Sequence, residues 1–161
     1  MIPTRRRLEY ASGYLDLGMI KDAEDELDMI EGKDAQSADV MRLRVALYHQ
    51  SKQWDQLTHV AEVLATLVPN EEQGWISWAY ALRELERVDQ AQSVLLRAEP
   101  LHGETSAVLH YNLACYACLL GDKEEALKRL SLACELEDDF LSSALDDPDL
   151  ESMQDEIADI F

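Results

Sequence analysis

Two cysteines three residues apart, Cys115 and Cys118, have the spacing in this sequence that most resembles a chemical motif. A Cys-x-x-Cys pair serves in disulfide exchange when it begins a helix, because the helix dipole lowers the thiol pKa there. This pair lies in the middle of an apolar stretch, and neither Cys134 nor His110 is spaced as a second pair of zinc ligands. We therefore interpret Cys115 and Cys118 as small apolar side chains, and we predict no metal site and no cofactor.

Other residues that could do chemistry do not form a known constellation. None of the histidines belongs to an HExxH or Cys-His nucleophile motif, and no glycine-rich phosphate loop occurs. General-base catalysis needs a base within hydrogen-bond reach of its nucleophile, and no such pair is indicated. The sequence predicts no catalytic residues and a protein that is not an enzyme. The tryptophans, which could form a sugar or base platform, fit core positions better (Trp54, Trp75, Trp78).

The chain is strongly acidic, and its charge is uneven. It has a net charge of −19 with 33 Asp and Glu, of which eleven lie within residues 135–161, where no Lys or Arg occurs. This charge repels phosphate backbones and anionic membrane surfaces, so we expect neither nucleic acid nor a membrane as a partner. A basic protein or peptide would be attracted. The alternative is that the charge only keeps the protein soluble.

The expected location is the cytoplasm. Three cysteines without a disulfide framework indicate a reducing compartment. The basic start, Met1 to Arg7, is not followed by the apolar segment of a signal peptide. No apolar run approaches the ~18–20 residues that a membrane-spanning helix needs.

Four near-copies of one pattern account for most of the 161 residues. Short segments that begin at Gly18, Lys52, Glu86 and Gly121 mark the second half of each copy and follow one another after 34, 34 and 35 residues. A period in this range is typical of stacked helical repeats. Few glycines and prolines, and no apolar–polar alternation, also favour an all-α fold. The copies span about residues 4–37, 38–71, 72–106 and 107–140.

Copy three shows the pattern of residue sizes most clearly. Numbered from the start of the copy, large residues occupy positions 4, 7, 11 and 24, and alanines occupy positions 8, 20 and 27 (Trp75, Trp78, Leu82, Leu95; Ala79, Ala91, Ala98). This pattern resembles the tetratricopeptide repeat (TPR), in which two helices, A and B, cross closely at small residues. The resemblance implies an all-α, right-handed TPR-like α-solenoid of four helix hairpins plus a C-terminal capping helix, as a single domain over residues 1–161.

Copy two departs from this pattern. Leucines occupy positions 20 and 27, where small residues belong, and Ala61 occupies position 24, where a large one belongs. We interpret this as an exchange of volume within one helix pair. Arg44 at position 7 is a further departure, for which we expect either a snorkelling side chain or a local shift of register.

The last segment, residues 141–161, is not a fifth copy. Asp147 and Pro148 are typical of an N-cap followed by a first helical residue. Apolar residues then recur at helical spacing (Leu150, Met153, Ile157, and Ile160 or Phe161). We predict a capping helix with an acidic outer face. Copy four and this segment resemble the closing module of many bacterial TPR proteins, which implies a bacterial source and no defined activity.

In TPR proteins, residues on the A helices line a groove that binds a peptide. The positions that match in this chain give the predicted binding residues: Arg42, His49, Ile76, Tyr80, Arg83, Tyr111, Cys115, Cys118 and Leu119. Because the A helix of copy four is apolar almost all round, its outer face must be covered. Two covers are possible. One is a partner segment whose apolar anchors dock near Tyr80, Tyr111 and Leu119 and whose acidic group Arg42 and Arg83 would hold. The other is the chain's own residues 139–161.

The resemblance implies a non-enzymatic protein-interaction module, such as an adaptor, an assembly factor or a chaperone-like protein. One alternative is a homo-oligomeric structural protein, because solenoid ends and apolar grooves can pair between protomers. Another is a chaperone like those for the translocators of type III secretion, although these typically carry three repeats. The chaperone-binding use of TPR proteins, which needs Lys or Arg and Asn at positions 2 and 6, is not indicated.

Overall fold

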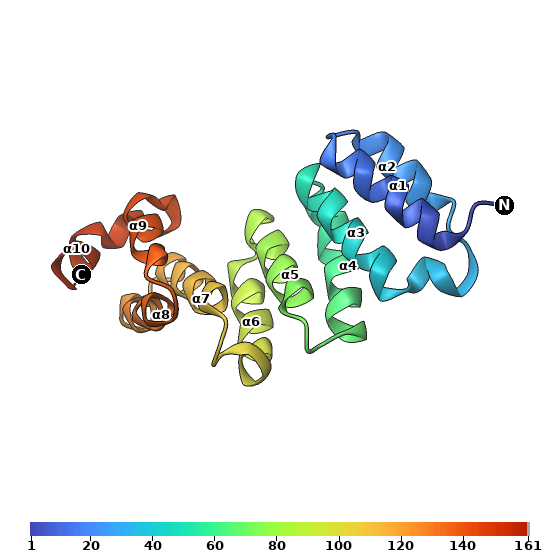
Figure 1. Cartoon of the computed structure of the whole chain (residues 1–161). Coiled ribbons are helices and arrows are strands. Elements are labelled where there is room, and N and C mark those ends of the chain that lie inside the picture. Colours follow the sequence, from blue (N-terminus) through green and yellow to red (C-terminus); the bar gives the residue numbers. More distant parts are fainter. Residues whose placement is uncertain (161) are drawn as a thin grey trace. The chain divides into compact units, whose positions relative to one another are not determined.

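The computed structural model describes residues 1–160, and every regular element in that range is helical (Figure 1). The chain divides into two compact units, Met1–Ala81 and Leu82–Phe161, and the division falls within one helix. The prediction of a single domain over residues 1–161 stays a prediction. None of the helices within residues 1–160 is long and apolar enough to cross a membrane.

The first unit consists of two helix hairpins and the start of a third. Helix α1 pairs with α2, and α3 pairs with α4. The elements are α1 (Thr4–Asp16), α2 (Ile20–Asp28), the 3₁₀ helix η1 (Gly32–Gln36), α3 (Ala38–Gln50), α4 (Trp54–Leu67) and most of α5 (Glu72–Glu84).

The second unit holds the end of α5, three further long helices, and the closing elements. Helix α7 packs between α6 and α8. The elements are α6 (Val88–His102), α7 (Ala107–Leu119), α8 (Lys123–Leu136), α9 (Asp139–Asp146), the 3₁₀ helix η2 (Pro148–Met153) and α10 (Gln154–Ile160). The A helices α1, α3, α5 and α7 thus begin at the residues with which the four sequence copies start.

Each A helix ends in the same backbone conformation. Position 15 of every copy has a positive φ, 72° at Gly18, 55° at Lys52, 61° at Glu86 and 85° at Gly121. Glycine adopts this left-handed conformation without strain, whereas Lys52 and Glu86 cost about 1 kcal/mol each. The turn geometry is therefore common to all four hairpins, although only two of them carry the glycine that marks it.

The core of the first unit contains the residues of the volume exchange in copy two. Leu57, Ala61 and Leu64 are all buried, so the two leucines occupy the volume that the alanine leaves. Arg44 lies with its side chain mostly covered, and its guanidinium reaches Asp28 on α2 at 2.8 Å. It therefore snorkels, and the register of copy two does not shift.

One glycine lets two helices of the first unit approach closely. A Cβ at Gly74 on α5 would lie 2.6 Å from the backbone nitrogen of Ala65 on α4 and 2.9 Å from its Cα. Both atoms are backbone, so the contact cannot be relieved by a change of rotamer. Gly13 on α1 differs, because no atom lies within 4 Å of its added Cβ.

Three helices of the second unit are joined by a buried polar network around Arg129 of α8. Its side chain is 8 % exposed and binds Glu99 of α6 at 2.5 Å and Glu125 of its own helix at 2.6 Å. Arg129 also donates to Nδ1 of His110 on α7 at 3.2 Å, and Nε2 of His110 lies 2.7 Å from the carbonyl oxygen of Gly103. Because the carbonyl can only accept, Nε2 carries the proton of a neutral imidazole. His110 is thus a buried packing residue with both nitrogens satisfied.

We predict opposite effects for two Gly→Ala substitutions in A helices. Gly74→Ala should lower the free energy of unfolding by about 2 kcal/mol, because the methyl group forces α5 away from α4. Gly13→Ala should raise it by about 0.5–1 kcal/mol, because alanine favours a helix interior and meets no neighbour. Urea denaturation followed by circular dichroism measures both. A Gly74→Ala protein as stable as wild type would contradict the close approach.

The ion pair of Glu99 predicts a pH dependence of stability. Hydrogen bonds from Arg129 hold the pKa of Glu99 below its ordinary value of 4.5. A carboxylate with a lowered pKa stabilises the fold above its unfolded pKa, and this contribution is lost as the pH falls through the folded value. Glu99→Gln should therefore cost about 2 kcal/mol at pH 7, and its difference from wild type should shrink below pH 4.5.

Denaturation midpoints between neutral and acid pH measure this difference. Glu104→Gln is the matched control, because Glu104 is exposed in the turn after α6. A Glu99→Gln deficit that stays constant across the acid range would show that the pair does not carry the pH dependence.

Candidate functional site

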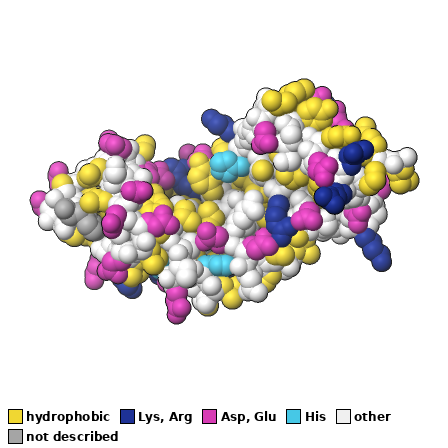
Figure 2. All heavy atoms as spheres, viewed as in Figure 1, with side chains coloured by type: hydrophobic (Ala, Val, Ile, Leu, Met, Phe, Trp, Pro, Cys, Tyr) yellow, Lys and Arg dark blue, Asp and Glu magenta, His cyan; other side chains and the backbone are white. Residues whose placement is uncertain are grey.

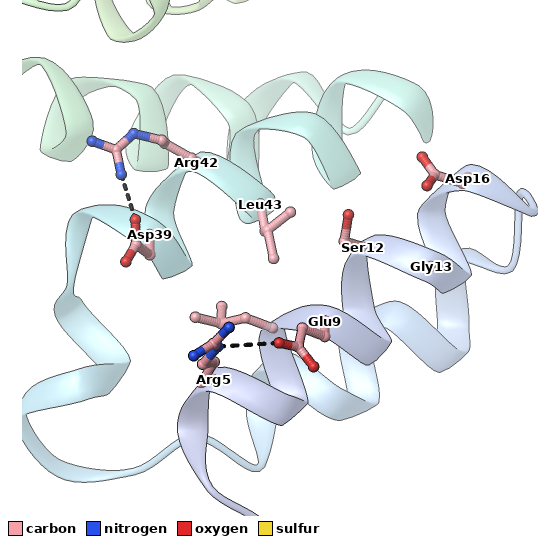
Figure 3. A pocket seen from close by; sticks show the side chains of 9 residues that line it. Arg5, Glu9, Ser12, Gly13, Asp16, Asp39, Arg42 and Leu43 are labelled. Carbon is pink, nitrogen blue, oxygen red and sulfur yellow. Dashed lines mark hydrogen bonds and ion pairs between the residues drawn. The ribbon is translucent and has the colours of Figure 1, made fainter.

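The first unit has an open groove between its first two A helices. Residues of α1 and α3 border a hollow of about 630 Å³, and Figure 3 shows Ser12 and Leu43 facing the space between the two helices. Of the nine binding residues predicted from the sequence, only Arg42 borders this hollow. The lining residues are Arg5, Leu8, Glu9, Ser12, Gly13, Asp16, Asp39, Arg42 and Leu43.

The groove has an apolar floor and a charged rim. Leu8 and Leu43 are half-buried and pack against the core of the unit. On the rim, Arg5 pairs with Glu9 at 3.2 Å. Figure 2 shows most of the Lys and Arg side chains on its visible face over the first unit. The groove therefore offers a ligand an apolar surface that is bordered by acidic and basic side chains.

Arg42, which the sequence predicted to hold an acidic group of a partner, already binds two carboxylates. Its Nε and Nη2 donate to Glu71 at 2.9 and 2.6 Å, and Nη1 lies 2.6 Å from Asp39. Hydrogen bonding to Arg42 in turn holds the pKa of Glu71 below its usual value. Because Arg42 is compensated by two carboxylates, the rim of the groove is acidic on balance.

The other predicted binding residues of the first unit lie on α3 and α5. The ring of exposed His49 lies 5.0 Å from that of half-buried Tyr80, and Trp54 on α4 lies 5.8 Å from Tyr80. The structure therefore brings His49 and Tyr80 together in an aromatic cluster. Ile76, one turn before Tyr80, is half-buried.

In the second unit, the chain's own closing elements cover the outer face of α7. The 3₁₀ helix η2 packs directly on α7, and α9 (Figure 1) packs on α8 and on η2. Leu150, Met153 and Ile157 are buried there, and the ring of Phe140 lies 4.8 Å from that of Tyr111. The sequence left open whether a partner segment or the chain's own residues 139–161 cover this face. In the structure, the chain's own residues cover it. Phe161, the last residue of the predicted apolar series, lies outside the described residues.

Polar contacts join the closing elements to three predicted binding residues. Arg83, at the end of α5, binds both carboxylate oxygens of Asp149, with 2.9 Å from Nε to Oδ2. The hydroxyl of Tyr111 donates to Asp147 at 2.6 Å. Burial and this hydrogen bond raise the pKa of Tyr111 far above its usual value, so the phenol stays a donor. Cys118 lies 3.3 Å from the hydroxyl of Ser152.

Cys115 faces the same acidic segment and is not a reactive thiol. Its sulfur lies 3.8 Å from Asp147. Burial, reinforced by the carboxylates of Asp147 and Asp149, raises the pKa of the Cys115 thiol, so the nucleophilic thiolate does not form. Leu119, the last predicted binding residue, is 43 % exposed at the end of α7.

Cys115, Asp147 and Asp149 are the residues closest to a metal-ligand set within the described chain, with ligand atoms within 4.8 Å of one another. The sequence analysis missed this grouping, because more than thirty residues separate the cysteine from the carboxylates. Asp149 is compensated by Arg83, and Asp147 accepts from Tyr111 and from the backbone N–H of Asp149 at 2.9 Å. Protein groups therefore already satisfy both carboxylates, and a cation would have to displace a guanidinium.

Sequence reasoning also missed Lys123 and Ser152. Lys123 of α8 donates to the carbonyl oxygen of Ser152 at 3.0 Å and to Glu156 at 2.9 Å. Asp147 did carry a sequence signal, since it caps η2 with Pro148 as the first helical residue. That signal marks where η2 begins, but it does not show which face η2 covers.

Neither a known protein family nor a curated protein matches the sequence. Solved structures do resemble it in three dimensions. A crystal structure of MamA has a TM-score of 0.81 at 12 % identity and covers 97 % of this chain and 86 % of that one. YrrB, a TPR protein with an unusual peptide-binding site, has a TM-score of 0.70 at 14 % identity over 96 % of this chain and 84 % of its own.

A third structure, TTC0263, is a thermophilic TPR protein of Thermus thermophilus. It has a TM-score of 0.66 at 19 % identity, with 96 % of this chain and 81 % of that chain covered. At these identities the likeness concerns the fold. It agrees with the repeat pattern, with the four hairpins and with the absence of strands among residues 1–160. The chain therefore has the fold of a TPR α-solenoid, with four helix hairpins and a C-terminal cap.

Proposed function

We propose that this chain is a non-enzymatic protein-interaction module that binds a peptide segment of another protein in the groove between α1 and α3. The observation that carries the proposal is the groove itself, about 630 Å³ of open space with an apolar floor. Six of its lining residues lie at A-helix positions that line the groove in TPR proteins (Arg5, Leu8, Ser12, Asp16, Asp39, Arg42). The similarity to YrrB, a TPR protein with a peptide-binding site, supports the same class of function.

The side chains of the groove indicate the chemistry of the peptide. Leu8 and Leu43 offer contact for one apolar side chain, which would supply most of the affinity by burial. Glu9 is paired with Arg5, and Arg42 is paired with Asp39 and Glu71, whereas Asp16 adds a further carboxylate. The net charge of −19 steers basic molecules toward the chain. The favoured ligand is a peptide with an apolar anchor beside a Lys or Arg.

The proposal also covers the nine binding residues predicted from the sequence. Four belong to the first unit, where they lie on α3 and α5 (Arg42, His49, Ile76, Tyr80). Five belong to the second unit, where they lie on α5 and α7 (Arg83, Tyr111, Cys115, Cys118, Leu119). Arg83, Tyr111 and Cys115 already contact Asp147 or Asp149, so the site we propose for the peptide is the α1–α3 groove of the first unit. Adaptors, assembly factors and chaperone-like proteins all work through such a groove.

Filling the groove at Gly13 tests the proposal without removing a core contact. Gly13→Phe adds a large side chain where the backbone has open space, so the helix should remain folded. Peptides selected by display on the wild-type chain should bind Gly13→Phe at least about tenfold more weakly, a loss of about 1.4 kcal/mol. Fluorescence anisotropy with a synthetic copy of each selected peptide gives the dissociation constants.

Gly13→Ala is the matched control, because it changes the same residue but leaves the groove open. It should bind the selected peptides as wild type does. Their affinity should also fall as salt is raised, if the rim carboxylates attract a basic residue. Peptides that bind Gly13→Phe and wild type equally would place the binding site elsewhere. A chain that selects no peptide but forms a stable dimer, measured by light scattering, would favour the homo-oligomeric alternative.

A further inference from the structure

The segment from Asp147 to Met153 lies on α7 in the way that a bound peptide would. Asp147 and Asp149, two residues apart, bind Tyr111 and Arg83, and Leu150 and Met153 insert apolar side chains beside them. These are the features that the sequence analysis expected of a partner's peptide, namely apolar anchors near Tyr111 and a carboxylate for Arg83. Here they are supplied by the chain itself.

The surface that this segment covers on and beside α7 carries positive charges, whereas the segment itself carries negative charges. Arg83 and Lys123 supply the cationic groups, and the phenol of Tyr111 supplies a neutral donor. The segment that covers them belongs to residues 135–161, which hold eleven acidic residues and no basic one. Charge complementarity therefore favours an acidic occupant on this face, in contrast to the α1–α3 groove.

Several features of residues 147–153 indicate that this segment can dissociate from α7. It is a 3₁₀ helix, whose hydrogen bonds are poorer than those of an α-helix. Pro148, Glu151 and Ser152 are exposed, and repulsion among the acidic residues of this part of the chain opposes its compact state. Its buried contacts with α7 come chiefly from two side chains, those of Leu150 and Met153.

We propose that the outer face of α7 is a second peptide-binding site, which residues 147–153 occupy as an intramolecular ligand. The ligand it takes in their place is an acidic peptide of another protein, with two carboxylates two residues apart and an apolar residue directly after the second. A tethered segment acts at an effective concentration in the millimolar range, so the site opens only to a partner that outcompetes it. This proposal does not depend on the α1–α3 groove.

The alkylation rates of the three cysteines report directly whether residues 147–153 cover α7. Cys115 and Cys118 are buried beneath it, whereas Cys134 on α8 is partly exposed and serves as the internal reference. In the full chain with Leu150→Ala and Met153→Ala, iodoacetamide should alkylate Cys115 and Cys118 at least tenfold faster than in wild type. The rate at Cys134 should not change. Mass spectrometry of the digested protein measures all three rates.

A synthetic peptide with the sequence of residues 146–153, Asp-Asp-Pro-Asp-Leu-Glu-Ser-Met, then tests the chemistry of the site. It should restore the protection of Cys115 and Cys118 in the double variant, and it should bind this variant at least tenfold more tightly than wild type. A peptide with Asn in place of Asp147 and Asp149 should not protect. Adding Arg83→Gln to the double variant should weaken binding about tenfold, whereas Gly13→Phe should not affect it.

Several results would overturn the proposal. They are unchanged alkylation of Cys115 and Cys118 in the double variant, failure of the acidic peptide to restore protection, and equal protection by the Asn peptide. If the double variant dimerises and its Cys115 and Cys118 become protected again as the protein concentration rises, the occupant would instead be a second copy of the chain. If the double variant loses its helical circular dichroism, Asp149→Asn, which keeps both apolar side chains, takes its place and the same measurements decide.

Discussion

Helix α7 has no polar side, and the second unit is organised around this constraint. From Ala107 to Cys118, all residues except Val108 and Asn112 are buried. A helix of this kind is stable in water only when other elements cover its whole circumference. Helices α6 and α8 cover part of it, η2 packs on it as well, and Phe140 of α9 lies against Tyr111. In the absence of another occupant, the fold of the unit therefore requires the acidic end of the chain as a cover.

Polar groups within this cover decide how the face can be used. Arg83 and Tyr111 would have unsatisfied donors beneath a purely apolar cap, and the half-exposed Lys123 has a carboxylate as its partner, so a cap on this face has to bring acceptors. Asp147, Asp149 and Glu156 are such acceptors. Any other occupant must meet the same demand, which is why the seated segment defines the chemistry of a competing ligand. The buried network of Arg129, Glu99 and His110 meets a similar demand with groups of the helices themselves.

The sequence predicted the elements that depend on local rules. The starts of the four A helices follow from the repeat, and the cap at Asp147 follows from the short-range hydrogen bond that its side chain accepts from the N–H group of Asp149. Copy two was interpreted from volume alone, and burial of Leu57 and Leu64 agrees with that interpretation. The left-handed residues Lys52 and Glu86 carried no such signal, because neither residue type favours a positive φ.

What the sequence left open depends on contacts between distant residues. The pairing of Arg83 with Asp149 spans 66 positions, and nothing local to either residue indicates it. The apolar face of α7 signalled that a cover was needed but not which chain would provide it, because burial by a partner and burial by the chain leave the same pattern. The α1–α3 groove was not predicted either, because Arg42 is the only one of its lining residues among those predicted from the repeat. It lies between helices of two different copies, and at Gly13, a residue without a side chain, the backbone borders open space.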